Sequence, residues 1–233
     1  MKTLEKLFSD LSYGELSDLY MSGEGSGSIL EEHHNRVALH VNDVLTELYT
    51  RYPLRVKECV IEMHEGVTNY HLDSRFALTK YDEDTNYTPY ILDLGREQFE
   101  DDVIKILFVM DQDGNSLPMN DTTRPDSVYT PQDRVLQMPF PSVGKILSVS
   151  YQALHPEVSA DNVEAELILP PALYTPLRQL VASRIFNSMD GKEGKAMNLI
   201  QLAEKQLGQL EESDALGVTI SQGNQVFDLG GYI

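Results

Sequence analysis

The hydrophobic pattern of the chain changes abruptly at residues 169–177, and this change limits the possible folds more than any other feature. Before it, Val163, Ala165 and Leu167 alternate with polar residues, a period typical of a half-exposed strand. After it, apolar residues recur three or four positions apart, as they do on one face of an α-helix. The prolines of the segment suit a first helical turn, where a missing amide is tolerated. We therefore predict that a strand ends and a helix begins here. The face that this helix buries comprises Leu173, Leu177, Leu180, Val181 and Ile185.

A second helical pattern follows and continues to about Glu212. Between the two patterns, Asp190-Gly191 favours a reversal of the chain, so we expect two antiparallel helices. Lys192 and Lys195 lie in this connection, and because a helix rather than a strand precedes them, we interpret them as turn residues and not as a phosphate-binding loop. The apolar face of the second helix comprises Ala196, Leu199, Ala203, Leu207 and Leu210.

The first 54 residues also show helical spacing. Apolar residues from Leu4 to Leu11 predict a first helix, and the pair Ser12 and Glu15 resembles a capping box that would start another. Residues 22–27 form a glycine- and serine-rich loop. A further helix, with a capping box at Ser28, would end before Pro53. Its predicted buried face comprises Val37, Val41, Val44, Leu45, Leu48 and Tyr52.

From Arg55 the hydrophobic period becomes two, which predicts strands. Asp113-Gly114 is typical of a hairpin turn after the strand at 103–110. We expect long polar loops at 81–88 and 119–134. The predicted strands cover residues 55–63, 70–79, 103–110, 146–154 and 163–169.

These patterns predict an α+β protein in which an antiparallel helical bundle, formed by N- and C-terminal helices, carries an inserted small antiparallel β domain and an extended C-terminal arm. The expected boundaries are 1–54 for the N-terminal helices, 55–168 for the inserted acidic domain, 169–212 for the C-terminal helices and 213–233 for the arm.

The net charge of −19 is the unusual feature of the composition. Residues 53–168 hold 21 acidic and 9 basic residues and so carry most of it. Such a surface cannot bind DNA through phosphate contacts, which require a basic face. The single cysteine cannot form an internal disulfide, and no apolar run approaches the ~20 residues of a spanning helix. We expect a soluble protein without a signal peptide and without a membrane partner.

Motifs for catalysis or cofactor binding are weak. Asp111 to Asn115 resembles the start of a calcium loop, but Gly114 stands fourth instead of sixth and Thr122 occupies the twelfth position. The histidines lack zinc-site spacing, and Cys59 has no nucleophile motif around it. We therefore expect no catalytic residue, no metal and no cofactor.

The C-terminal arm is glycine-rich and yet retains large apolar side chains. A disordered end, a strand folded back on its own sheet and docking on another subunit are three possible roles, and we favour docking. An isolated arm would bind modestly, whereas a ring of linked arms would bind tightly through avidity. The candidate docking residues are Val226, Phe227, Leu229, Tyr232 and Ile233.

Three short segments of the chain resemble the head-to-tail adaptor proteins, also called head completion or connector proteins, of tailed bacteriophages, especially short-tailed ones. The resemblance covers both helical parts and the arm and is weak over 55–165. Members of the family often have a tryptophan near the terminal glycines, where this chain has Tyr232. The segments that carry the resemblance are 11–17, 168–185 and 227–233.

The resemblance implies a virion protein at the head-tail interface, with twelve copies in a ring under the portal protein. The arm would reach the portal through Val226, Phe227, Leu229, Tyr232 and Ile233, while the rest would meet the tail nozzle or another tail protein. DNA would pass through the lumen without specific binding, and acidic walls would favour its passage. Other possibilities are a monomeric hydrolase or carbohydrate-binding module that uses the β domain, and another tail or capsid protein such as a tail terminator.

Overall fold

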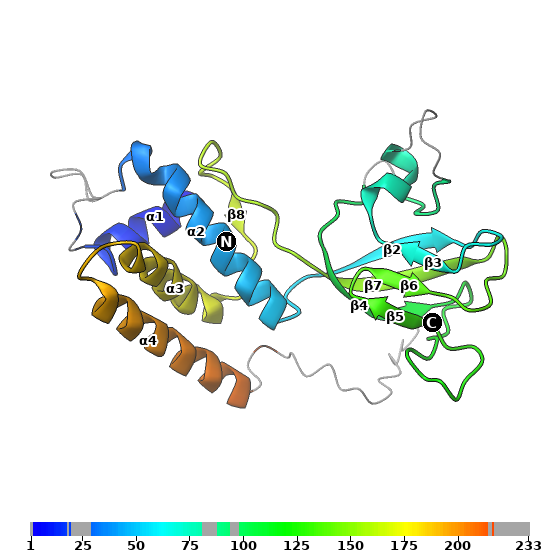
Figure 1. Ribbon diagram of the computed structural model, residues 1–233. Coiled ribbons are helices and arrows are strands. Elements are labelled where there is room, and N and C mark those ends of the chain that lie inside the picture. The colour runs from blue at the N-terminus through cyan, green and yellow to red at the C-terminus, as the bar shows by residue number, and fades with distance from the viewer. Residues whose placement is uncertain are drawn as a thin grey trace, which may run out of the picture. The chain divides into compact units, whose positions relative to one another are not determined.

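A computed structural model describes residues 2–17, 19, 29–80, 88–93, 98–213 and 216 (Figure 1). Within these residues the chain is a mixed α/β protein with four α-helices and eight strands, the strands lying in three sheets. The chain divides into two compact units. The first unit comprises Met1–Leu45 with Val158–Ile233, and the second comprises Thr46–Glu157.

The prediction of a helical bundle as the framework of the fold is wrong. Helices are few in the described residues, and the β content is substantial. Even the first unit contains a sheet, because β1 (Lys2–Thr3) pairs antiparallel with β8 (Glu166–Leu167). The strand predicted over 163–169 is present only as the two residues of β8, and β1 is too short to show a period, so the sequence pattern could not reveal the pairing of the two.

Four helices form most of the first unit: α1 (Leu4–Tyr13), the first part of α2 (Glu31–Arg51), α3 (Tyr174–Asn187) and α4 (Glu193–Glu212). A 3-10 turn, η3 (Pro171–Leu173), leads into α3, which confirms the helix predicted to begin in this segment. The predicted helix start at Ser12 is wrong. Ser12 lies inside α1, where its hydroxyl donates a hydrogen bond to the Phe8 carbonyl at 2.8 Å.

Helix α3 is the centre of the first unit, and 10 of its 14 residues are buried. Figure 1 shows it between α4 and the helices α1 and α2. Polar contacts fix it to α1 and to the turn that follows α1. The Tyr174 hydroxyl donates to Asp10 at 2.9 Å, and the Arg178 guanidinium donates to Glu15 at 2.8 Å. These contacts therefore join segments about 160 residues apart in the sequence.

The second unit contains two three-stranded antiparallel sheets. One has the order β2 (Val56–Glu62), β7 (Ile146–Ala153), β4 (Val103–Met110), and the other has the order β3 (Asn69–His71), β6 (Val135–Gln137), β5 (Tyr129–Gln132). Their shared core includes large side chains such as Tyr70, Tyr151 and Ile61. The predicted strands at 55–63, 103–110 and 146–154 are confirmed as β2, β4 and β7.

Two other predictions in this unit are wrong. The strand expected over 70–79 ends at His71 and gives way to the 3-10 turns η1 (Ser74–Phe76) and η2 (Leu78–Lys80), because the Asp73 side chain caps η1 by accepting the Arg75 amide. The loop expected over 119–134 contains β5. The hairpin at Asp113-Gly114 is confirmed, with Gly114 at φ +80° and an antiparallel bridge between Met110 and Ser116.

Gln152 of β7 joins the last turn of α2 to the sheet of the second unit. Its side chain is fully buried, and its amide nitrogen donates to the carbonyl of Tyr52 at 3.1 Å and also to the carbonyl of Tyr49. Since carbonyls at a helix C-terminus have no partner within the helix, a side-chain donor that reaches them stabilises the helix end. Gln152 therefore determines how α2 ends against β7.

We predict that Gln152→Ala lowers the free energy of unfolding by about 2–3 kcal/mol, because it removes a buried donor and leaves a cavity. Urea unfolding followed by circular dichroism measures this change. The exposed Gln112 provides the control, and Gln112→Ala should change stability by less than about 0.5 kcal/mol. Equal stability of the two variants would contradict the role of Gln152.

Candidate functional site

Helix α4 packs on one neighbouring helix and exposes several large apolar side chains. It packs chiefly against α3 through a stripe that includes Ala196, Ala203 and Leu207. Outside this stripe, Met197, Ile200 and Leu202 are 56%, 38% and 44% exposed. Three large apolar side chains on one exposed helix are typical of a contact surface for another protein.

The exposed apolar residues of α4 lie on both sides of the buried stripe. At 100° per residue, Met197 and Ile200 fall on one flank and Leu202 on the opposite flank. One flank could bind one neighbouring molecule while the other binds a second. We call Met197, Ile200 and Leu202 the α4 flanks.

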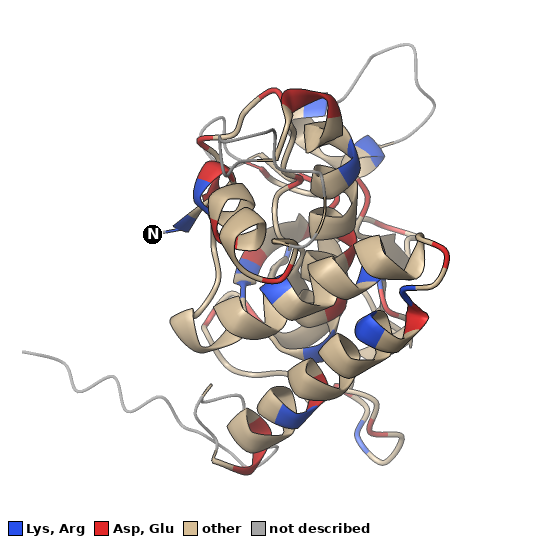
Figure 2. Ribbon diagram, turned by 90° about the vertical axis from the view of Figure 1, so that its left-hand side faces the viewer, with Lys and Arg blue, Asp and Glu red and all other residues tan. Residues whose placement is uncertain are grey.

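The charges of the first unit are mixed. Figure 2 shows acidic and basic residues interspersed along its helices. On α4, Glu204 and Lys205 are adjacent, and the Lys195 ammonium lies 4.5 Å from the centroid of the Phe186 ring. The described helices therefore present no uniformly basic face, such as a nucleic-acid-binding surface requires.

A second exposed apolar feature lies in the connection between β6 and β7. Phe140 and Val143 are 77% and 63% exposed. Pro139 and Pro141 flank Phe140 and restrict its backbone, so the aromatic ring is presented at a low entropic cost of binding. This connection is a candidate contact for a protein partner.

A network of ion pairs holds the start of β4 against β2 and β7. Asp102 accepts hydrogen bonds from Lys57 at 3.0 Å, from Arg55 at 3.3 Å and from the Tyr151 hydroxyl at 3.2 Å. Glu100 accepts from Lys57 at 3.0 Å. Burial and the charge of Asp102 raise the pKa of Tyr151. Because two cations meet two carboxylates, the network neutralises itself and we interpret it as structural.

The hydrogen bond from Lys57 lowers the pKa of Glu100 below its ordinary value. A carboxyl whose pKa is lowered by folding stabilises the folded state above its unfolded pKa, and this contribution is lost as the pH falls through the folded pKa. We predict that Lys57→Met raises the pKa of Glu100 toward 4.5, as followed by carbon-13 NMR titration. Lys105→Met, at an exposed position of β4, should leave it unchanged, and an unchanged Glu100 titration in Lys57→Met would contradict the assignment.

Cys59 and His34, which the sequence offered as candidates for a reactive or metal-binding site, both have packing roles in the structure. Cys59 is 7% exposed in β2, and burial, with the nearby charges of Glu58 and Asp102, raises the pKa of its thiol to about 12. It is therefore a neutral thiol at physiological pH. His34 lies against the Phe8 ring at 4.6 Å and hydrogen-bonds the Ile29 carbonyl at 3.0 Å, a packing role.

Asp111 is the carboxylate of the calcium-like segment, and its own turn satisfies it. One of its oxygens accepts the amides of Asp113 at 2.9 Å and Asn115 at 2.8 Å. This is a turn stabilised by an aspartate side chain. Across the part of the chain that the structure describes, no group of three or more His, Cys, Asp or Glu residues could hold a metal ion.

The candidate docking residues of the arm, Val226, Phe227, Leu229, Tyr232 and Ile233, lie outside the described residues. They stay a prediction. The α4 flanks were missed by the sequence analysis, because Leu199, Ile200, Leu202 and Ala203 form one continuous apolar arc of the helix, and the pattern does not show which part of it is exposed. Ile200 is four residues from Ala196 and three from Ala203, which are both buried, so the spacing places it next to the buried stripe but does not show that α3 leaves it exposed.

Comparisons with known proteins identify no family. No protein-family model matches the chain, and no curated protein matches it. Among the helices that the structure describes, none combines the length and the apolar character required to cross a bilayer.

Proposed function

We propose that this protein is a structural adaptor of a phage virion, which forms a ring between the portal protein and the tail and surrounds the DNA exit channel. The observation that carries the proposal is the pair of apolar α4 flanks on one edge of the first unit. The resemblance of the two helical parts and the arm to head-to-tail adaptors supports it. The acidic composition also suits a channel wall that does not bind phosphates.

Two different flanks on one helix suit a cyclic assembly. In a ring each copy contacts two neighbours through two different surfaces, whereas a two-fold dimer uses the same surface on both copies. Transferring a half-exposed Met, Ile or Leu side chain out of water contributes on the order of 1 kcal/mol. One such contact is weak, so the ring would form on a platform that already holds the copies together.

The portal would be that platform in this proposal. The arm residues Phe227, Leu229 and Tyr232, with Val226 and Ile233, would anchor each copy on the portal, twelve times around the ring. Linked arms then bind with avidity that one arm lacks. Phe140 and Val143 of the second unit offer a contact for a tail protein.

We predict that the double substitution Ile200→Glu, Leu202→Glu prevents ring closure, because it places charge on both α4 flanks. Native mass spectrometry of the protein mixed with its portal should show partial occupancy instead of a full ring. Gln201→Glu with Gln209→Glu adds the same charge at exposed polar positions of α4 and should leave the ring intact. Circular dichroism checks that both variants fold, and a full ring from the first variant would overturn the role of the flanks.

We predict that deletion of residues 224–233 removes portal binding, because it removes all five anchors of the arm. Pull-down on purified portal, followed by light scattering of the mixture, measures the loss. A chain in which only Gln222 and Asn224 are replaced by alanine keeps the anchors and should still bind. If the shortened chain bound the portal as well as the full chain does, the assignment of the arm would be wrong.

A further inference from the structure

The sheet of β2, β7 and β4 has one buried face and one open face. On the buried face, residues such as Ile61, Val149 and Val109 join the core that this sheet shares with the second sheet. The residues between them point to the opposite side, because successive side chains of a strand alternate between the two faces. We call this opposite side the outer face. It comprises Val56, Glu58, Val60 and Glu62 of β2, Gln152, Ser150, Ser148 and Ile146 of β7, and Lys105, Phe108 and Met110 of β4.

The outer face forms a groove along β7. Ser148 and Ser150 of this central strand are its floor. The register sets Phe108 and Met110 opposite them on β4, and Val60 on β2. Ser150 is only 4% exposed, because the longer side chains on either side rise above it. The floor therefore lies between two raised banks, one on β2 and one on β4.

Much of the groove is apolar and accessible. Val56 and Ile146 are 52% and 41% exposed at its two ends. Between them, Val60, Phe108 and Met110 are half-buried. Large apolar side chains gathered on one accessible sheet face are typical of a surface that another element covers.

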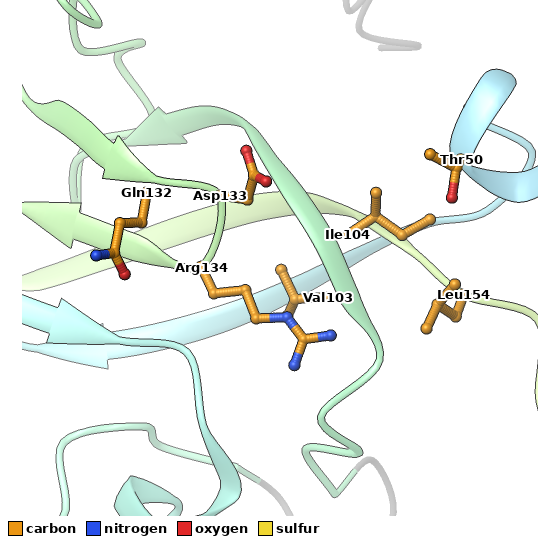
Figure 3. A pocket seen from close by; sticks show the side chains of 7 residues that line it. All are labelled: Thr50, Val103, Ile104, Gln132, Asp133, Arg134 and Leu154. Carbon is orange, nitrogen blue, oxygen red and sulfur yellow. The ribbon is translucent and has the colours of Figure 1, made fainter. Parts of the chain in front are cut away.

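The last turn of α2 closes the groove at one end, where the Gln152 amide bonds the carbonyl of Tyr52 at 3.1 Å. A pocket of about 460 Å³ lies beside this end, and Figure 3 shows Thr50 and Leu154 there, across from the turn between β5 and β6. Because that turn belongs to the second sheet, the pocket is separate from the groove. The other end of the groove, at Ile146, is open.

The charges of the groove differ between its two banks. Glu58 and Glu62 lie on β2, about 14 Å apart at ~3.4 Å per residue. Neither forms an ion pair among the described residues, although Glu58 accepts a hydrogen bond from the Ser148 hydroxyl. The β4 bank carries a single charge, that of the exposed Lys105. A complementary partner therefore has cations facing β2 and a carboxylate facing Lys105.

The dimensions of the groove match one α-helix. Its banks are separated by β7 and so lie about 10 Å apart, which is the diameter of a helix with its side chains. Strand β2 has 7 residues and is about 20 Å long, the length of about 13 helical residues. Two cations on one flank, two turns apart, reach both Glu58 and Glu62, because two turns span about 11 Å and long basic side chains cover the remainder.

We propose that this groove binds an amphipathic helix of a partner protein, with an apolar face and two basic residues on one flank. The apolar face packs on Val60, Phe108 and Met110, and the two cations pair with Glu58 and Glu62. In this helix-in-groove mode, apolar anchors provide affinity and flanking charges fix the orientation. A second copy of this chain fits less well, because each copy carries a net charge of −19. This binding is independent of the proposed ring, because it concerns the second unit and is measured on the free protein.

A designed helical peptide tests the proposal. The probe is an acetylated, amidated and fluorescein-labelled peptide of about 16 residues, with leucines on one face, two lysines two turns apart on its flank, and alanine and glutamine elsewhere. Fluorescence anisotropy with the full chain should show one saturable site. Ile146→Lys should weaken binding about tenfold, because it places a positive charge at the open end of the groove. Leu78→Lys, at a 52% exposed residue of η2 in the same unit, is the control and should leave binding unchanged.

A charge exchange separates this site from a general attraction between a basic peptide and an acidic protein. Glu62→Lys should weaken binding about fivefold. A peptide in which the facing lysine is replaced by glutamate should bind the Glu62→Lys protein more tightly than it binds the original chain. Asp133→Lys makes the same change of charge in the turn between β5 and β6 and should alter the affinity less than about twofold.

Circular dichroism checks that each variant folds, and Glu62→Lys keeps the test decisive if Ile146→Lys does not. Absence of peptide binding, or equal weakening by Glu62→Lys and Asp133→Lys, would overturn the proposal. Light scattering of the free protein tests the second copy as occupant. A dimer that Glu62→Lys or Ile146→Lys dissociates would show that the groove binds this chain itself and would also overturn it.

Discussion

The burial of α3 on nearly all its sides is the constraint on which the first unit depends. Since 10 of its 14 residues are buried, α3 requires neighbours on most of its sides. Helices α1, α2 and α4 supply them, and the short sheet of β1 and β8 holds the chain beside the start of α1. Because α3 covers only the stripe of Ala196, Ala203 and Leu207, the α4 flanks stay exposed. The surface proposed for assembly is therefore a consequence of how α4 covers the core.

The second unit has a different constraint, because the edge strands of its two small sheets must be paired or protected. Residues 115–119 pair with the end of β4, and Pro131 protects β5. Gln152 attaches the end of α2, and the carboxylates of Glu100 and Asp102 neutralise Arg55 and Lys57. The start of β4 carries a register shift between Val103 and Lys105, and a bulge together with a lysine also protects a strand edge.

The α4 flanks are apolar, and each contact that they offer is weak individually. They therefore suit repeated contacts between identical copies.

The sequence by itself determined where the long periodic elements lie. Spacings of three and four located α2, α3 and α4, and alternation located β2, β4 and β7, because each of these elements buries one face over several turns or residues. Only the tertiary structure decided the pairing of Lys2–Thr3 with Glu166–Leu167, the strand β5 and the 3-10 turns after His71. A period can indicate a strand, as it does near Leu167, but it does not show which strand is the partner, and Lys2–Thr3 is too short to show a period. Likewise, Leu202 and Ala203 are both apolar in sequence, and only the position of α3 decides that Ala203 is buried and Leu202 is exposed, since burial depends on neighbours from distant parts of the chain.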